Sequence, residues 1–211
     1  MTEPFQQKNV THLIINEWER VDPNLLVGFT TKNGGFSQGG FSSLNLGLHV
    51  EDELEHVIKN KQKLSTHLSW DTNKWVGCEQ IHENRIIKVQ KKDIGLGVFD
   101  YNSSIEGTDG IYTYEKNILL TLCFADCVPL YFWSIDDKIV GLAHAGWKGT
   151  VKGIGPSMIE AWEQEGINRS DIRVAIGPAI SSCCYEVNDY VMDKVKLKLG
   201  NEVHTQHLIW T

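Results

Sequence analysis

The segment that most constrains the fold is residues 119–150, LLTLCFADCVPLYFWSIDDKIVGLAHAGWKGT. It contains three short apolar runs, separated first by a polar elbow at Asp126-Cys127 and then by the acidic pair Asp136-Asp137. Because the runs are short and alternate poorly, they predict three mostly buried strands rather than helices. A two-residue turn at the acidic pair then predicts that the second and third strands form a hairpin.

Two residues with reactive side chains lie at the ends of this predicted hairpin. Cys127 begins one arm, and His144, seventeen positions later (144 − 127), ends the other. Such positions are neighbours in a hairpin, so a thiol and an imidazole are expected side by side at one sheet edge. The pair is either part of a metal site or a nucleophile with its base. A buried cysteine and a core histidine without chemistry are the simpler alternative, although the glycine-flanked position of His144 favours function.

The composition bounds the class of protein. The 211 residues are 41% hydrophobic and 22% charged, which is ordinary for a soluble globular chain. The formal charge of −7 disfavours a broad nucleic-acid interface, and no apolar run is long enough to span a bilayer. The start, MTEPFQQKNV, lacks a secretory-signal pattern, and five cysteines favour reduced thiols. We therefore expect a cytoplasmic protein with one domain over residues 1–211.

The pattern of elements predicts an α+β fold, with mixed, largely antiparallel sheets covered by helices. Helices are expected at 52–68, where Asp52 and Glu55 resemble a capping box, at 151–164 and at 188–199. The glycine-rich segment 32–40 predicts a loop, without the pattern of a phosphate-binding loop. Strands or short strand–turn pieces are expected, outside the central segment, at 12–18, 25–31, twice within 74–89, and at 95–100, 108–113, 171–177 and 207–211.

A catalytic zinc site needs a third protein ligand, which leaves a fourth position for water. His82, in a polar connection between two predicted strands, is the first candidate, and His49, near the glycine-rich loop, is the second. A Cys/His/His set suits Zn²⁺, which activates water for attack on amino-bearing carbons in nucleobase deaminases. Two alternatives stay open. In one, Cys127 is the nucleophile of a thiol hydrolase or deamidase, with His144 as its base; in the other, the domain binds zinc or a partner without catalysis.

Several residues beside these motifs are candidates for substrate contacts. Asp126 is either a proton acceptor next to the cysteine or a strand-end cap. Trp147 either stacks on a base or sugar or fills space beneath its loop. The basic residues nearest to these motifs are Lys32, Arg85 and Lys148. Each of them either binds a phosphate or is an ordinary charged surface residue.

Seven segments, taken in order, resemble those of a known family. They are TTKNGGFS, FSSLNLGLHVEDE, EQIHE, TDGIYT, FADCVPL, AHAGWKGT and AIGPAISSCCYEV. In this order they resemble the laccase-domain family, also called multicopper polyphenol oxidase proteins, or the purine nucleoside phosphorylase family with a human macrophage member. The resemblance runs from Thr30 to Val187.

The resemblance implies a fold like the catalytic domain of cytotoxic necrotizing factor and a zinc site formed by His82, Cys127 and His144. It also implies purine nucleoside chemistry. That chemistry is the phosphorolysis of adenosine, inosine, guanosine and methylthioadenosine with inorganic phosphate, and the deamination of adenosine. The older family assignment is copper-dependent phenol oxidation. The chain has no His-x-His pair of the kind a multicopper site uses, but copper is also a plausible ion for the same three ligands.

The matching segments also supply candidate roles for individual residues. To catalysis we assign His82, Cys127, His144 and Asp126, and to substrate binding Lys32, Asn45, Gln80, Trp147 and Lys148. The family usually has arginine at the positions of Lys32 and, often, Lys148, and glycine at that of Glu83. Members usually continue for a few dozen residues, with a Cys-Thr pair and an aromatic-Ser-Tyr-Arg motif, so we expect that tail to be missing here.

Overall fold

The predicted hairpin forms the centre of a five-stranded sheet. The computed structural model describes residues 3–199, so the strand predicted at 207–211 lies outside the described residues. Strands β8 (Val128–Ser134) and β9 (Ile139–Ala145) pair antiparallel, with Pro129 opposite His144. The sheet order is β10-β8-β9-β6-β5, and only β5 and β6 run parallel. The other strands of this sheet are β5 (Ile86–Lys88), β6 (Gly110–Thr113) and β10 (Arg173–Ile176).

The turn of the hairpin is longer than the sequence suggests. It comprises residues 135–138 rather than the acidic pair alone. The Ser134 hydroxyl donates to the Asp137 carboxylate at 2.6 Å, and Lys138 takes a left-handed conformation with φ 53°. The side-chain hydrogen bond and the left-handed residue close a four-residue turn, so the prediction of a two-residue turn was wrong.

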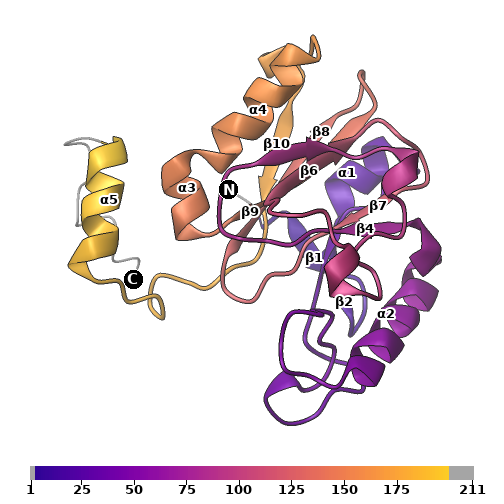
Figure 1. Cartoon of the computed structure of the whole chain (residues 1–211). Coiled ribbons are helices and arrows are strands. Elements are labelled where there is room, and N and C mark those ends of the chain that lie inside the picture. Colours follow the sequence, from indigo (N-terminus) through magenta and orange to yellow (C-terminus); the bar gives the residue numbers. More distant parts are fainter. Residues whose placement is uncertain (1–2, 200–211) are drawn as a thin grey trace.

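Both faces of the sheet are buried, which explains why its strands alternate poorly in sequence. On one face, Phe132 and Ala143 pack against Ile154, Met158 and Trp162 of helix α4 (Ile154–Gln164). Figure 1 shows α3 (Trp147–Lys152) and α4 beside this sheet. On the other face, the sheet packs on a cluster that includes Phe5, Ile15, Trp18, Val27, Tyr131, Trp133, Leu142 and Ala175.

A small antiparallel sheet supplies the layer on that second face. It consists of β1 (Phe5–Gln7), β2 (His12–Ile15) and β3 (Gly28–Thr30), and α1 (Asn16–Val21) follows β2 directly. The predicted strand at 12–18 therefore ends three residues early. Trp18 is the only buried residue of α1, and Glu17 and Glu19 lie in its first turn, where acidic side chains favour a helix.

The predicted helix at 151–164 is two helices, because the chain bends between them at Gly153. This residue has φ 86°, a conformation that glycine adopts without strain, and it ends α3 and precedes α4. The predicted C-terminal helix is α5 (Asp189–Leu199). Residues 95–100 contain no strand, since the chain there forms turns beside a 3-10 helix at Tyr101–Ser103.

Helix α2 (Leu54–Leu68) packs beside a parallel pair of strands, β4 (Trp75–Gly77) and β7 (Leu119–Thr121). The helix was predicted, but its capping box was wrong. Asp52 instead accepts hydrogen bonds from Ser37 and Asn45, and no side chain caps the first turn. With these elements, the predicted α+β fold with mixed, largely antiparallel sheets is confirmed. Within residues 3–199, no helix is long and apolar enough to cross a membrane.

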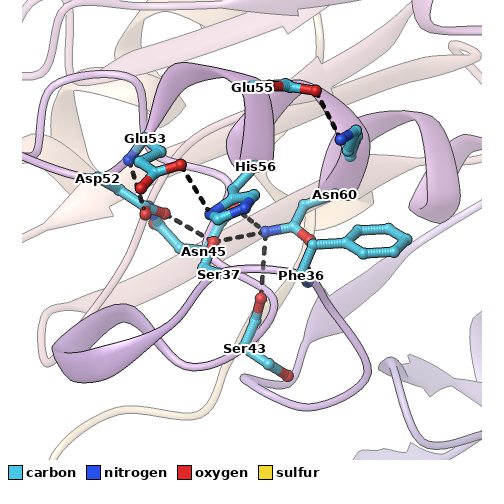
Figure 2. A network of polar contacts seen from close by, with 10 residues as sticks. Phe36, Ser37, Ser43, Asn45, Asp52, Glu53, Glu55, His56 and Asn60 are labelled. Atoms are coloured by element: carbon cyan, nitrogen blue, oxygen red, sulfur yellow. Dashed lines mark hydrogen bonds and ion pairs between the residues drawn. The ribbon is translucent and has the colours of Figure 1, made fainter.

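A polar network on α2 holds the glycine-rich loop (Figure 2). The Asn60 side chain is completely buried and makes four hydrogen bonds. It accepts from the backbone N–H of Phe36 and donates to the Ser37 hydroxyl and to the carbonyls of Ser43 and Asn45. One side chain thus fixes both ends of residues 36–45.

Replacing Asn60 by leucine is expected to lower the free energy of unfolding by about 2–4 kcal/mol, because three backbone groups lose a buried partner. Urea denaturation of both proteins measures the change. Asn102→Ala is the matched control, since Asn102 is exposed and is expected to change stability by less than about 0.5 kcal/mol. Equal stability of Asn60→Leu and the wild type would contradict a structural role for the network.

Candidate metal centre

Three predicted ligands meet at one end of the central hairpin. The ligand atoms of His82, Cys127 and His144 all lie within 4.8 Å of one another. Cys127 directly precedes β8, His144 is near the end of β9, and His82 lies in the connection between β4 and β5. The two imidazole rings are edge to face, with centroids 4.7 Å apart. The thiol and the two imidazoles are therefore close enough together to bind one ion.

Asp109 holds the loop that carries His82. Its carboxylate is completely buried and accepts the backbone N–H groups of Ile81, His82 and Glu83 at 3.1, 3.0 and 2.8 Å. His82 itself has φ 62°, a left-handed conformation that is uncommon for residues with a side chain. Three backbone donors on one carboxylate compensate that conformation and fix the direction of the His82 side chain.

The same carboxylate orients the second histidine. His144 is 3% exposed, and its Nδ1 lies 2.7 Å from Asp109 Oδ1. This contact favours a proton on Nδ1, which donates it in a hydrogen bond to the carboxylate. Nε2 is then free to bind a metal, as is usual for metal-binding histidines. Burial alone would raise the pKa of Asp109, but its hydrogen bonds from His144 and the backbone hold that pKa below the ordinary value. Asp109 is therefore anionic at neutral pH.

Gly146 provides the space at the centre of the three ligands. A Cβ atom there would lie 2.9 Å from Cδ2 of His82, 3.1 Å from Sγ of Cys127 and 3.6 Å from Cε1 of His144. The backbone of Gly146 has φ −64° and ψ 162°, which any residue can adopt. Its small size, and not its backbone freedom, is what the site requires.

The protonation states of the ligands favour metal binding over thiol chemistry. Burial, together with the charges of Asp126 and Asp109, raises the pKa of the Cys127 thiol. Without a metal the thiol is thus protonated at neutral pH, which disfavours a free nucleophile. Burial and the charges of His144 and Lys148 lower the pKa of His82, so its imidazole is neutral and able to bind a metal.

The donor set fits a zinc ion. Zn–N distances of about 2.0–2.1 Å and Zn–S distances of about 2.3 Å place tetrahedral ligands roughly 3.3–3.7 Å apart, so three atoms within 4.8 Å need only a small closure. The mix of one thiolate and two imidazoles suits Zn²⁺ and is also compatible with copper. Three protein ligands, rather than four, are typical of catalytic zinc sites.

The three ligands line a cavity of about 360 Å³. Of the predicted substrate residues, only Gln80 lines it, and the Gln80 amide exchanges two hydrogen bonds with the backbone of Cys123 at 2.7 and 2.8 Å. Lys32 and Asn45 line a larger neighbouring cavity of about 660 Å³. The Asn45 amide is bound to Asp52 and to the backbone of Gly47. Gln80 and Asn45 thus have structural partners for their polar atoms.

The other residues considered for the site differ in their relation to the cavity. Asp126 is exposed and lines the smaller cavity beside Cys127. Glu83 forms an ion pair with Lys152. Trp147 begins α3 and packs edge-on against Tyr190, with ring centroids 6.0 Å apart, while Lys148 is exposed beside it. Neither Trp147 nor Lys148 is among the residues that line the cavity.

Asp109 is the residue of the candidate site that the sequence analysis missed. It lies in the segment TDGIYT, which carried the family resemblance, yet no role was derived for it. Its position becomes meaningful only because β6 pairs with β9, which places Gly110 opposite Ala143 and Asp109 next to His144. An aspartate directly before a buried strand, followed by glycine, was the available signal.

Together, the mixed α/β layers and the Cys/His/His cluster define an enzyme-like domain with a candidate mononuclear metal site. The family model described as multi-copper polyphenol oxidoreductase laccase matches residues 26–208. The chain belongs to this family.

Several bacterial relatives have names that refer to nucleosides. Over 197 residues the chain is 49% identical to the purine nucleoside phosphorylase YlmD of Bacillus subtilis, an alignment that covers 92% of this chain and 71% of that protein. It is also 49% identical to YlmD of Geobacillus stearothermophilus, over 84% of this chain and 65% of that protein. The chain thus spans about two thirds of the length of these relatives.

Two solved structures have the same fold. The hypothetical protein YfiH of Bacillus licheniformis superposes with a TM-score of 0.90 at 48% identity, over 95% of this chain and 74% of the other. The structure of YlmD from Geobacillus stearothermophilus gives a TM-score of 0.89 at 45% identity, over 96% of this chain and 75% of the other.

Proposed function

We propose that this protein is a zinc-dependent purine nucleoside enzyme. Its reactions are the phosphorolysis of adenosine, inosine, guanosine and methylthioadenosine, and the deamination of adenosine to inosine. The observation that carries the proposal is the cluster of His82, Cys127 and His144 on the wall of a cavity. The names of the relatives support the substrate class. We further propose that the reactions take place in the cytoplasm.

The residues of the chain have distinct roles in this proposal. His82, Cys127 and His144 hold the ion, and Asp109 keeps both imidazoles in the orientation that binding requires. When bound, the zinc ion supplies a Lewis acid that activates water at neutral pH. The cavity of about 360 Å³ positions the nucleoside and limits its contact with bulk water.

Asp126 is the proposed proton carrier. Its carboxylate is exposed, lines the cavity and is adjacent in sequence to Cys127. In deamination it would take a proton from the attacking water and return it to the departing amine. Glu83 suits this role less well, because its carboxylate is paired with Lys152. Lys32, Asn45, Gln80, Trp147 and Lys148 remain proposed substrate contacts, and among them Gln80 alone lines the cavity of the triad.

The raised pKa of Cys127 favours the metal enzyme over a thiol hydrolase. A Cys–His hydrolase would be inactivated by thiol alkylation and would be insensitive to chelators. A non-catalytic zinc domain would use four protein ligands, whereas the cluster found within residues 3–199 has three. Copper-dependent phenol oxidation is the older alternative, and the same three ligands would have to bind copper.

Product analysis tests the proposed function. The zinc-loaded protein is incubated with adenosine, with and without phosphate, and the products are separated by chromatography. Adenine with ribose 1-phosphate is expected in the presence of phosphate, and inosine is expected in its absence. If adenosine is recovered unchanged under both conditions, the proposed function is wrong. Hydrolysis of an amide or ester substrate with insensitivity to chelators would favour the thiol hydrolase.

A further inference from the structure

Lys61 is a buried cation on the wall of the cavity that contains the three ligands. It lies on α2, the residue is 7% exposed, and it lines this cavity together with His82, Cys127 and His144. Lys61 also lines the larger neighbouring cavity. Among the residues of the described chain that line the cavity, it is the only lysine or arginine. The sequence pattern did not single it out, because a lysine on a helix is ordinarily a surface residue.

The ammonium of Lys61 has fewer partners than it can use. Its Nζ donates to the carbonyl of Val98 at 2.7 Å, whereas an ammonium carries three donors. Within residues 3–199, no carboxylate oxygen lies within 4.0 Å of the Lys61 ammonium nitrogen. A buried charge without a counter-ion is costly, and an anion bound in the cavity would remove that cost. Consistently, burial lowers the pKa of Lys61.

The other basic residues near the site are poorly placed for an anion in this cavity. Lys148 is exposed and lines neither cavity. Lys32 lines the larger cavity alone, whereas Lys61 lines both. The Arg85 guanidinium donates to the carbonyl of Glu106 at 2.8 Å. His49 does line the cavity, and burial and the charges of His144 and Lys61 lower its pKa, so it offers a neutral donor rather than a charge.

We propose that Lys61 is the residue that binds inorganic phosphate in the cavity, and thereby places it for attack on the nucleoside. This inference rests on the proposed function for its reaction. In that reaction, an oxygen of hydrogenphosphate forms a bond to the anomeric carbon of ribose while the bond from that carbon to the purine nitrogen breaks. The bonding pair leaves with the purine, and the proton of hydrogenphosphate ends on the purine. The ammonium holds the phosphate against the negative charge of the departing base.

The test replaces Lys61 by glutamine, which removes the charge but keeps a donor for the carbonyl of Val98. The KM for phosphate is expected to rise about 10- to 100-fold, as for loss of a charged hydrogen bond, while the KM for adenosine changes less than threefold. Lys61→Arg keeps the charge and should largely restore the KM for phosphate. Lys63→Gln, a partly exposed position two residues along α2, is the matched control and should match the wild type.

A binding measurement separates this proposal from the proposed function. Inorganic phosphate should raise the midpoint of thermal unfolding of the wild type and of Lys63→Gln, relative to sodium chloride at equal ionic strength, but not that of Lys61→Gln. Zinc content of each variant by elemental mass spectrometry checks that the site is intact. Equal phosphate protection, or an equal KM for phosphate, in wild type and Lys61→Gln would overturn the proposal. Selective phosphate protection in a protein without phosphorolysis would support the phosphate site and contradict the proposed function.

Discussion

Replacing Gly146 by alanine is expected to weaken zinc binding strongly while leaving the protein folded. The added Cβ would lie within 3.1 Å of both His82 and Cys127, so at least one ligand must move away from the others. Alanine adopts the backbone conformation of Gly146 without strain, so the fold itself is not penalised. We expect the affinity for zinc to fall by at least about 10- to 100-fold, the size of effect seen when groups that position metal ligands are altered.

Zinc affinity of Gly146→Ala is measured by competition with a chelator of known affinity, and folding by circular dichroism. Gly40→Ala is the matched control, because an added Cβ at Gly40 meets no atom within 4 Å. That control should bind zinc like the wild type. Unchanged zinc affinity in Gly146→Ala would show that the ion, if any, is not held between His82, Cys127 and His144.

The second large effect is expected for Asp109→Asn. In the wild type, the two carboxylate oxygens of Asp109 accept four hydrogen bonds from N–H groups. In the variant, an NH₂ group replaces one of these oxygens and must face N–H donors. If it faces His144, the Nδ1 of that ring must accept and the proton moves to Nε2, the atom that the metal needs. We expect zinc affinity to fall about 10- to 100-fold and the free energy of unfolding to fall by about 2–4 kcal/mol.

The pH dependence of this stability difference has a defined sign. The folded pKa of Asp109 lies below its ordinary value of 3.8, so its contribution is fully present above pH 3.8. That contribution is lost as the pH falls through the folded pKa. The difference between wild type and Asp109→Asn, measured by urea denaturation of metal-free protein, should therefore shrink below pH 3.8.

Asp100→Asn is the control for this substitution. Asp100 is exposed and its side chain caps a 3-10 turn, a role that asparagine also fills. It should keep the stability and zinc affinity of the wild type. Full zinc occupancy together with wild-type stability in Asp109→Asn would refute the positioning role of Asp109.

The central hairpin and two of the three clustered residues could be predicted because local signals determine them. Cys127 and His144 lie at paired ends of two consecutive strands, and a turn between those strands brings them together. The third ligand, His82, comes from a distant segment. The sequence pattern ranked His82 before His49 but did not exclude His49. The family resemblance then selected His82. In the structure, His82, rather than His49, is in the cluster.

What the sequence did not predict depends on contacts between distant segments. The buried face of α2 includes Asn60 and Lys61, whereas the apolar Leu54 is 56% exposed. Periodicity assigns polar residues to the surface, but Asn60 is needed inside to bind the loop 36–45, and Lys61 lines a cavity. Asp109 escaped notice for the same reason, since its partners come from residues 81–83 and from β9.

The most direct test of the account is the metal content of the wild type and of Cys127→Ala, measured by elemental mass spectrometry alongside turnover of adenosine. We expect close to one zinc per wild-type chain, with loss of both zinc and turnover in Cys127→Ala, because the thiolate is one of only three protein ligands in the cluster found within residues 3–199. A wild-type protein that contains no metal and still converts adenosine would contradict the account and would make Cys127 a nucleophile.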